Sequence, residues 1–147
     1  GVAVINLDIF KLKDGGNQNA TAVLLDVLAE RYELPLMIVE NGIGLHETAD
    51  MIDPADGMIH DDDRISYFQS HIAEMKKAVD EDGVDLWGYC PWGPIDLVSA
   101  GTGEMEKRYG FIYVDYDNQF NGTGKRSLKD SYYWYKKVTA SNGEDLG

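Results

Sequence analysis

Uninterrupted apolar runs alternate along this chain with segments whose apolar residues recur at helical spacing. Residues 35–39, Pro-Leu-Met-Ile-Val, contain no polar position, which is typical of a parallel strand buried on both faces. Residues 84–92 predict a second strand, which Pro91 and Gly93 bring to an end. Residues 2–12 alternate in part between apolar and polar side chains and predict a third strand, followed by a loop over residues 13–18.

Two helices are predicted between these strands. The first begins at an N-cap, either Asn19 or Thr21, and ends near Tyr32. Its apolar residues at helical spacing are Ala20, Val23, Leu24, Val27 and Leu28. The second helix begins at the acidic residues 62–63, which favour the positive end of a helix, and it ends at Gly83. Its apolar stripe is Ile65, Phe68, Ile72, Met75 and Val79.

The last third of the chain predicts a hairpin and one more helix. Residues 111–116 form a short strand, and a turn-rich segment follows that can return as a second strand at residues 125–126. Ser127 and Asp130 form a weak capping box for a helix that ends at residues 142–143. The alternation of strands and helices predicts an α/β fold over a single unit, residues 1–147.

Charge and cysteine content narrow the classes of partner. The chain carries 13 Lys and Arg against 26 Asp and Glu, a formal net charge of −13, which argues against nucleic acid and anionic membranes as partners. No apolar run approaches the ~20 residues of a membrane helix. The single cysteine, Cys90, has no partner for an intramolecular disulfide, so we expect a reducing, cytoplasmic location.

Glu40 is the first candidate for chemistry, because it follows the apolar run 35–39 and precedes an Asn-Gly turn. A carboxylate at a strand's end can equally form a turn hydrogen bond. Residues 42–61 form a long loop after it, of the kind that often has a function. Gly42-x-Gly44 does not predict a dinucleotide site, because no helix begins before about residue 62.

Metal binding is not predicted. His46, His60 and His71 are too scattered for a metal-ligand spacing, and residues 61–63 lack the alternation and terminal Glu of a calcium loop. We interpret residues 61–63 as a helix cap, and we expect neither a metal nor a cofactor.

Residues 38–42, Ile-Val-Glu-Asn-Gly, resemble the nucleophile motif of the family 1 glycoside hydrolases. In that family the motif ends the seventh strand of a (β/α)₈ barrel, so the resemblance implies that Glu40 attacks the anomeric carbon in a retaining hydrolysis. It also implies that Trp92, at the exit of the next strand, is the floor on which the sugar stacks. Trp87 and Tyr89 share that strand, and at least one of the three aromatic residues must be core.

Residues 99–110, Ser-Ala-Gly-Thr-Gly-Glu-Met-Glu-Lys-Arg-Tyr-Gly, resemble the 6-phospho-β-glucosidase branch of the family. Relatives that act on plain glucosides have a Glu where this chain has Ser99. The resemblance implies that Ser99, Lys107 and Tyr109 hold the sugar 6-phosphate, and an ammonium with hydroxyl donors suits a phosphate monoester. Without the resemblance, a solvated Lys-Arg pair is the simpler interpretation. Many relatives carry a hydroxyl residue at the position of Gly101, which offers only its backbone amide.

The resemblance also shows what this sequence lacks. A complete barrel takes about 250 residues, so we expect the C-terminal part of a (β/α)₈ barrel, its last βα units with a short hairpin. We expect residues 1–19 to lie outside the resemblance to the family. The family's acid/base Glu lies in an Asn-Glu-Pro motif, which does not occur here. Buried strands outside a closed barrel leave uncovered edges and faces, so we expect a homo-oligomer or exchange of elements between copies.

Two functions therefore remain open. The chain is either of a lineage that hydrolyses 6-phospho-β-glucosides, inactive in isolation because the acid/base is missing, or a non-catalytic barrel fragment that binds sugar phosphates weakly at most.

Overall fold

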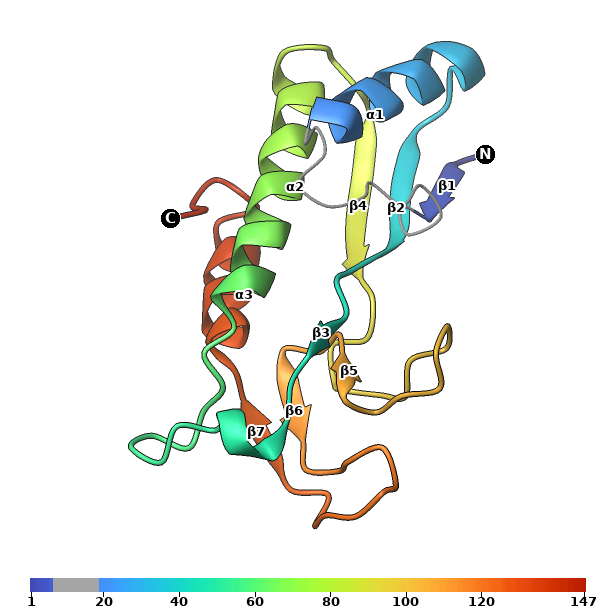
Figure 1. Cartoon of the computed structure of the whole chain (residues 1–147). Coiled ribbons are helices and arrows are strands. Elements are labelled where there is room, and N and C mark those ends of the chain that lie inside the picture. Colours follow the sequence, from blue (N-terminus) through green and yellow to red (C-terminus); the bar gives the residue numbers. More distant parts are fainter. Residues whose placement is uncertain (7–18) are drawn as a thin grey trace. The chain divides into compact units, whose positions relative to one another are not determined.

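The computed structural model describes residues 1–6 and 19–147 (Figure 1). The strand predicted over residues 2–12 is present as β1, Ala3–Asn6, whereas its remainder and the predicted loop 13–18 lie outside the described residues. Contacts divide the chain into a first unit, Gly1–Asn41 with Phe68–Pro91, and a second unit, Gly42–Tyr67 with Trp92–Gly147. That the chain forms one partial-barrel unit stays a prediction.

The first unit is built on a parallel sheet. Strands β1, β2 (Leu36–Asn41) and β4 (Leu86–Pro91) lie in the order β1-β2-β4, and both pairs are parallel. The predicted parallel strands are thus confirmed. The prediction that residues 35–39 are buried on both faces of the sheet is wrong, because Leu36 and Ile38 are fully buried but Val39 is 41% exposed. Helices cover one face of this sheet and leave part of the other open.

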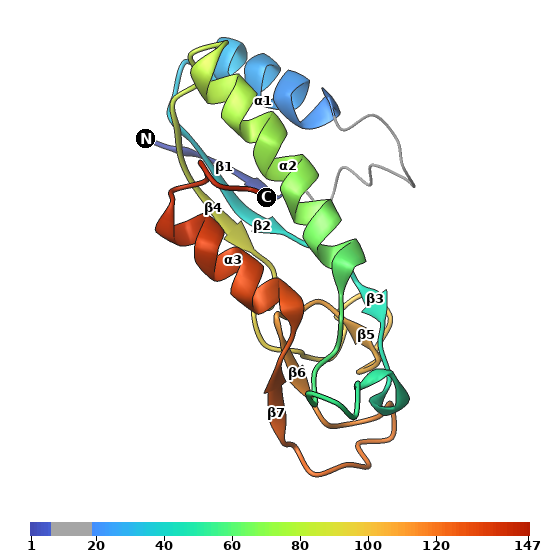
Figure 2. The same ribbon diagram turned by 90° about the vertical axis from the view of Figure 1, so that its left-hand side faces the viewer.

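Two helices complete the first unit, α1 (Asn19–Tyr32) and α2 (Asp62–Asp80). Of α2, only the residues from Phe68 onward belong to this unit. Figure 2 shows both helices in front of the sheet. Leu25 and Phe68 are fully buried. The predicted stripe of α2 is confirmed at Phe68, Ile72 and Met75 and is wrong at Val79, which is 40% exposed. Among the described residues, no helix has the length and hydrophobicity needed to cross a bilayer.

The predicted apolar face of α1 is wrong. Val23 and Val27 are more than half exposed, whereas Thr21, Ala22 and Leu25 are buried. The helix carries apolar side chains around most of its circumference, so their spacing alone did not determine which side packs inward.

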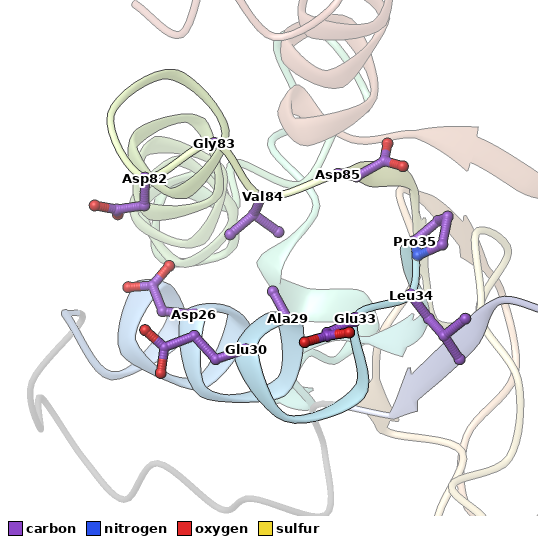
Figure 3. Close-up of a pocket in the computed structure, with 10 residues that line it drawn as sticks. All are labelled: Asp26, Ala29, Glu30, Glu33, Leu34, Pro35, Asp82, Gly83, Val84 and Asp85. Carbon is purple, nitrogen blue, oxygen red and sulfur yellow. The ribbon is translucent and has the colours of Figure 1, made fainter.

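An acidic pocket of about 470 Å³ opens where α1 ends and where β2 and β4 begin (Figure 3). Its five carboxylates belong to Asp26, Glu30, Glu33, Asp82 and Asp85. Desolvation raises the pKa of Asp26, and repulsion from Asp82 and Glu30 raises it further. Since Glu40 lies at the opposite, carboxyl end of β2, this pocket is separate from the predicted catalytic residue.

The second unit contains two short antiparallel pairs and a helix. Strand β3 (Leu45–His46) pairs with β5 (Lys107–Arg108), and β6 (Ile112–Val114) pairs with β7 (Arg126–Leu128). A 3₁₀ turn, η2, spans Ala49–Met51, and α3 spans Asp130–Ala140. The predicted hairpin is confirmed. The capping box at Ser127 is wrong, because Ser127 lies in β7 and the N-cap of α3 is Lys129.

The interior of the second unit holds a buried charge cluster of three cations and three carboxylates. Its members, all at most 6% exposed, are Glu47, Asp61, Arg64, Asp96, Arg108 and Lys129. Lys129 Nζ donates to Glu47 Oε2 at 2.5 Å and to Asp96 Oδ1 at 3.0 Å, and Arg64 Nε donates to Asp61 Oδ2 at 2.8 Å. Arg64 also pairs with Glu47. The opposite charges match in number, as burial of ionised groups requires.

Asp61 shows how this cluster joins distant segments. It directly precedes α2, but its carboxylate accepts hydrogen bonds from the backbone N–H and the hydroxyl of Ser131, at 2.9 and 2.6 Å. An N–H of the first turn of α3 is therefore satisfied from a segment 70 residues earlier. The interpretation of residues 61–63 as the cap of the helix that follows them is wrong for the Asp61 side chain, because the helix that it caps is α3.

Candidate functional site

Glu40 is the penultimate residue of β2, at the carboxyl end of the parallel sheet. It lies opposite Asn6 of β1 after a register shift, and the pairing of β2 with β4 also shifts between Ile38 and Asn41. Its neighbour Asn41 is 1% exposed and accepts a hydrogen bond from Tyr89 Oη of β4 at 2.7 Å. The strand that carries Glu40 is therefore tied at its end to the next strand of the sheet.

The three aromatic residues predicted around β4 have different environments. The Tyr89 ring packs edge-on against Phe68, with ring centroids 6.4 Å apart, so it contributes to the core of the first unit. Trp87 is 64% exposed. Trp92, half-buried, belongs to the second unit, where its Cβ and its carbonyl oxygen lie over Gly42. A role for Trp92 as the sugar floor stays a prediction.

The three predicted phosphate ligands lie near one another in the second unit. Ser99 Oγ lies 3.4 Å from Tyr109 Oη, and Lys107 Nζ lies 6.0 Å from the centre of the Tyr109 ring. Ser99 is 1% exposed and is held in a turn, where its N–H donates to the Glu104 carbonyl at 2.9 Å. We call these three residues the Ser99–Lys107–Tyr109 group. One ammonium and two hydroxyls form a donor set suited to an anion.

Gly101, the departure from the family pattern, is exposed, and a Cβ added there would meet nothing within 4 Å. A hydroxyl residue would therefore fit at this position.

Glu40 belongs to the first unit, whereas Trp92 and the Ser99–Lys107–Tyr109 group belong to the second unit.

Arg108 is a supporting residue that sequence reasoning missed, because a Lys-Arg pair suggests two solvated side chains. Arg108 is 1% exposed, and its guanidinium lies 4.2 Å from the centre of the Tyr113 ring. Its nitrogens donate to the carbonyl oxygens of Glu47, Val114 and Tyr116 at 2.7, 2.8 and 2.6 Å. No sequence signal could have found it, because β5 has only two residues and shows no alternation.

His60 lies in a separate, exposed group with Asp53, Asp56 and Asp130. His60 Nδ1 lies 2.7 Å from Asp130 Oδ2, and Nε2 lies 3.5 Å from Asp53 Oδ2 and 3.6 Å from Asp56 Oδ2. Asp53, Asp56 and His60 bring potential metal-ligand atoms within 4.8 Å of one another, although the three histidines form no common spacing. The arrangement suits ion pairing with the imidazole when it is protonated.

We expect this group to make the stability of the second unit depend on pH. The hydrogen bond to Asp130 raises the pKa of His60 above 6.5, and the Asp130 charge adds to the effect. A raised histidine pKa stabilises the folded state fully below pH 6.5 and loses that contribution as the pH rises through the folded-state value. The urea midpoint of His60→Gln should therefore lie below that of the parent under acidic conditions, and the gap should close in alkaline buffer. A gap independent of pH would contradict the ion pairing.

Comparisons with known proteins identify the family of this chain. The sequence matches glycosyl hydrolase family 1 over residues 16–144. It is 58% identical over 117 residues to aryl-phospho-beta-D-glucosidase BglA of Bacillus subtilis, covering 80% of this chain and 24% of that protein. It is 56% identical over 123 residues to the phospho-cellobiase of Klebsiella oxytoca, covering 84% of this chain and 25% of that protein. The chain thus spans about a quarter of the length of these relatives.

Solved structures give the same assignment. The family 1 β-glucosidase of Thermotoga maritima superposes with a TM-score of 0.74 at 35% identity, covering 88% of this chain and 27% of that one. The family 1 structures are barrels, and this chain is a small α/β part of one without closure of its own, as the sequence predicts. The chain belongs to glycosyl hydrolase family 1.

Proposed function

We propose that this chain carries the nucleophile strand and the phosphate-binding segment of a retaining 6-phospho-β-glucosidase. The observation that carries the proposal is the Ser99–Lys107–Tyr109 group, because it gathers donors for an anion within a strongly acidic chain. The names of the relatives from Bacillus subtilis and Klebsiella oxytoca, a phospho-glucosidase and a phospho-cellobiase, support a phosphorylated β-glucoside as substrate. The lone thiol of Cys90 favours a cytoplasmic location.

Each residue then has a defined part in the reaction. The phosphate is held by the Ser99–Lys107–Tyr109 group, and the apolar face of the pyranose stacks on Trp92. A Glu40 oxygen attacks the anomeric carbon as the bond to the aglycone oxygen breaks, which gives a covalent glycosyl-enzyme that water then hydrolyses. An acid about 5–5.5 Å away must protonate the leaving oxygen.

That acid is not identifiable in this sequence, which contains no Asn-Glu-Pro motif. General acid catalysis is worth roughly 10²- to 10⁴-fold in rate, so the 147-residue chain by itself should turn over ordinary 6-phospho-β-glucosides hardly at all. The alternative is a non-catalytic fragment that binds sugar phosphates weakly.

We also propose that copies of the chain associate. Apolar side chains lie exposed on each strand of the parallel sheet, with Val4 68%, Val39 41% and Trp87 64% exposed. Exposed large apolar side chains on neighbouring strands favour coverage by another molecule. A homo-oligomer that covers this sheet is therefore the proposed state of the isolated chain.

An activated substrate tests the proposal without the missing acid. A dinitrophenyl 6-phospho-β-glucoside has a leaving group that departs without a proton, so we expect the chain to release dinitrophenolate and Glu40→Gln to release none. The unphosphorylated counterpart should react more slowly. Equal release by both proteins would overturn the role of Glu40. No release together with saturable binding of glucose 6-phosphate would establish the non-catalytic alternative, and light scattering on the same samples reports association.

A further inference from the structure

The backbone of Gly44 lies directly against two of the predicted phosphate ligands. A Cβ added to Gly44 would stand 2.8 Å from Tyr109 Cζ and 2.9 Å from both Lys107 Cε and Lys107 Cγ. Such distances are too short for non-bonded carbon atoms, whose optimal separation is about 3.5–4.0 Å. Gly42 is less crowded, with the added Cβ 3.4 Å from Trp92 Cβ and 3.7 Å from Tyr109 Cδ1. The Gly-x-Gly segment, unsuited to a dinucleotide, therefore packs beneath the Ser99–Lys107–Tyr109 group.

Gly44 is required here for space and not for backbone freedom. Its φ lies outside the left-handed region, unlike that of Gly93 or Gly103. Alanine can adopt this backbone without strain, so the whole effect of Gly44→Ala falls on the side chains above it. The Tyr109 ring is rigid and can move only as a body, whereas Lys107 can change rotamer.

Strand β5 cannot move away from Gly44 to relieve the crowding. Gly44 directly precedes β3, and β3 pairs with β5 through Leu45 with Arg108 and His46 with Lys107. On the opposite side of β5, Arg108 is buried and bound to three carbonyl oxygens. Lys107 and Tyr109 thus flank Arg108, which anchors β5, and Gly44 leaves the space in which their side chains lie.

We propose that Gly44 is the specificity-determining positioning residue of the phosphate pocket. With no side chain at position 44, the Lys107 ammonium and the Tyr109 hydroxyl converge on one anion, the phosphate monoester at C6 of the sugar. A methyl group at position 44 displaces them from each other and from Ser99, so the pocket loses its selection of the phosphorylated sugar. The ligand assignment rests on the proposed function, whereas the positioning by Gly44 rests on the distances alone.

The test compares three glycine variants of the 147-residue chain by titration with glucose 6-phosphate and with glucose. Loss of a hydrogen bond to a charged group corresponds to a drop in affinity of roughly 10- to 100-fold, which we expect for glucose 6-phosphate with Gly44→Ala. Gly42→Ala should show a smaller drop. Gly88→Ala is the control, since its Cβ would meet only flexible Met37, at 3.5 Å, and it should bind like the parent.

Two readouts separate positioning from general damage. Urea midpoints report whether each variant folds, and nuclear Overhauser contacts from the Gly44 Hα protons to the Tyr109 ring and the Lys107 methylenes test the packing in the parent itself. Unchanged glucose 6-phosphate affinity in folded Gly44→Ala overturns the proposal, as does the absence of those contacts.

Failure of the proposed function has a different signature. If the parent shows no saturable binding of glucose 6-phosphate, the phosphate assignment is wrong for Gly44 and for the Ser99–Lys107–Tyr109 group alike. The Tyr109 ring resonances then decide the positioning claim: a shift in Gly44→Ala but not in Gly88→Ala supports it, and no shift in either rejects it.

Discussion

Lys129→Met is expected to lower the free energy of unfolding of the second unit by roughly 3–5 kcal/mol, the cost of removing one partner from a buried ion pair. The Lys129 side chain is fully buried, and its ammonium donates to both Glu47 and Asp96. Its removal leaves two cations against three carboxylates in the buried charge cluster. Since a domain's net stability is about 5–15 kcal/mol, this loss removes a large share of it.

Urea denaturation of parent and variant measures this loss. Lys136→Met is the matched control, because Lys136 is an exposed lysine of α3, and a surface substitution is expected to change stability by no more than about 0.5 kcal/mol. Similar midpoints for the two variants would show that the Lys129 ion pairs contribute little net stability.

Phe68→Ala is expected to cost the first unit roughly 3–5 kcal/mol, the range for a fully buried aromatic residue truncated to alanine. Phe68 is 0% exposed, and its ring supports Tyr89 edge-on. Tyr89 donates to Asn41, the residue after Glu40. The cavity should therefore loosen the end of the nucleophile strand as well as the core.

Denaturation monitored by tryptophan fluorescence gives the stability change, and hydrogen exchange at the Asn41 amide reports the strand end. Val79→Ala, on the same helix but 40% exposed, is the control and should have a small effect on both. Destabilisation by Phe68→Ala without faster exchange at Asn41 would show that Tyr89 holds the strand end without help from Phe68.

The first unit could be predicted from the sequence because its elements are long enough to show a pattern. Residues 35–39 form an apolar run without alternation, which predicted the strand seen as β2. The spacing of Phe68, Ile72 and Met75 predicted the buried face of α2. The face of α1 could not be predicted, because apolar residues occur around most of that helix and burial depends on the sheet it meets.

The second unit was harder to predict for a physical reason. Strands β3 and β5 have two residues each, too few for any period to appear. Its interior contains charged residues beside apolar ones, and composition alone assigns charged residues to the surface. Arg108 and Lys129 are buried only because carboxylates and carbonyl oxygens from distant segments surround them.

The candidate site was reached through family resemblance to short motifs, and the structure adds the grouping of Ser99, Lys107 and Tyr109. No sequence pattern indicated Gly44, because its role depends on close approach to residues about sixty positions later in the chain.

The buried charge cluster also constrains how this segment can evolve. A hydrophobic core can change by single substitutions between apolar side chains of similar volume, each at a modest cost in stability. A cluster of matched buried charges has no such small steps, because each change of sign or loss of charge leaves an opposite charge buried and unpaired. Substitutions within it are strongly non-additive, so descendants should inherit all six residues together or replace several at once. Among relatives, these positions should therefore vary as a linked set, and their joint loss would mark the lineages in which the second unit has been rebuilt.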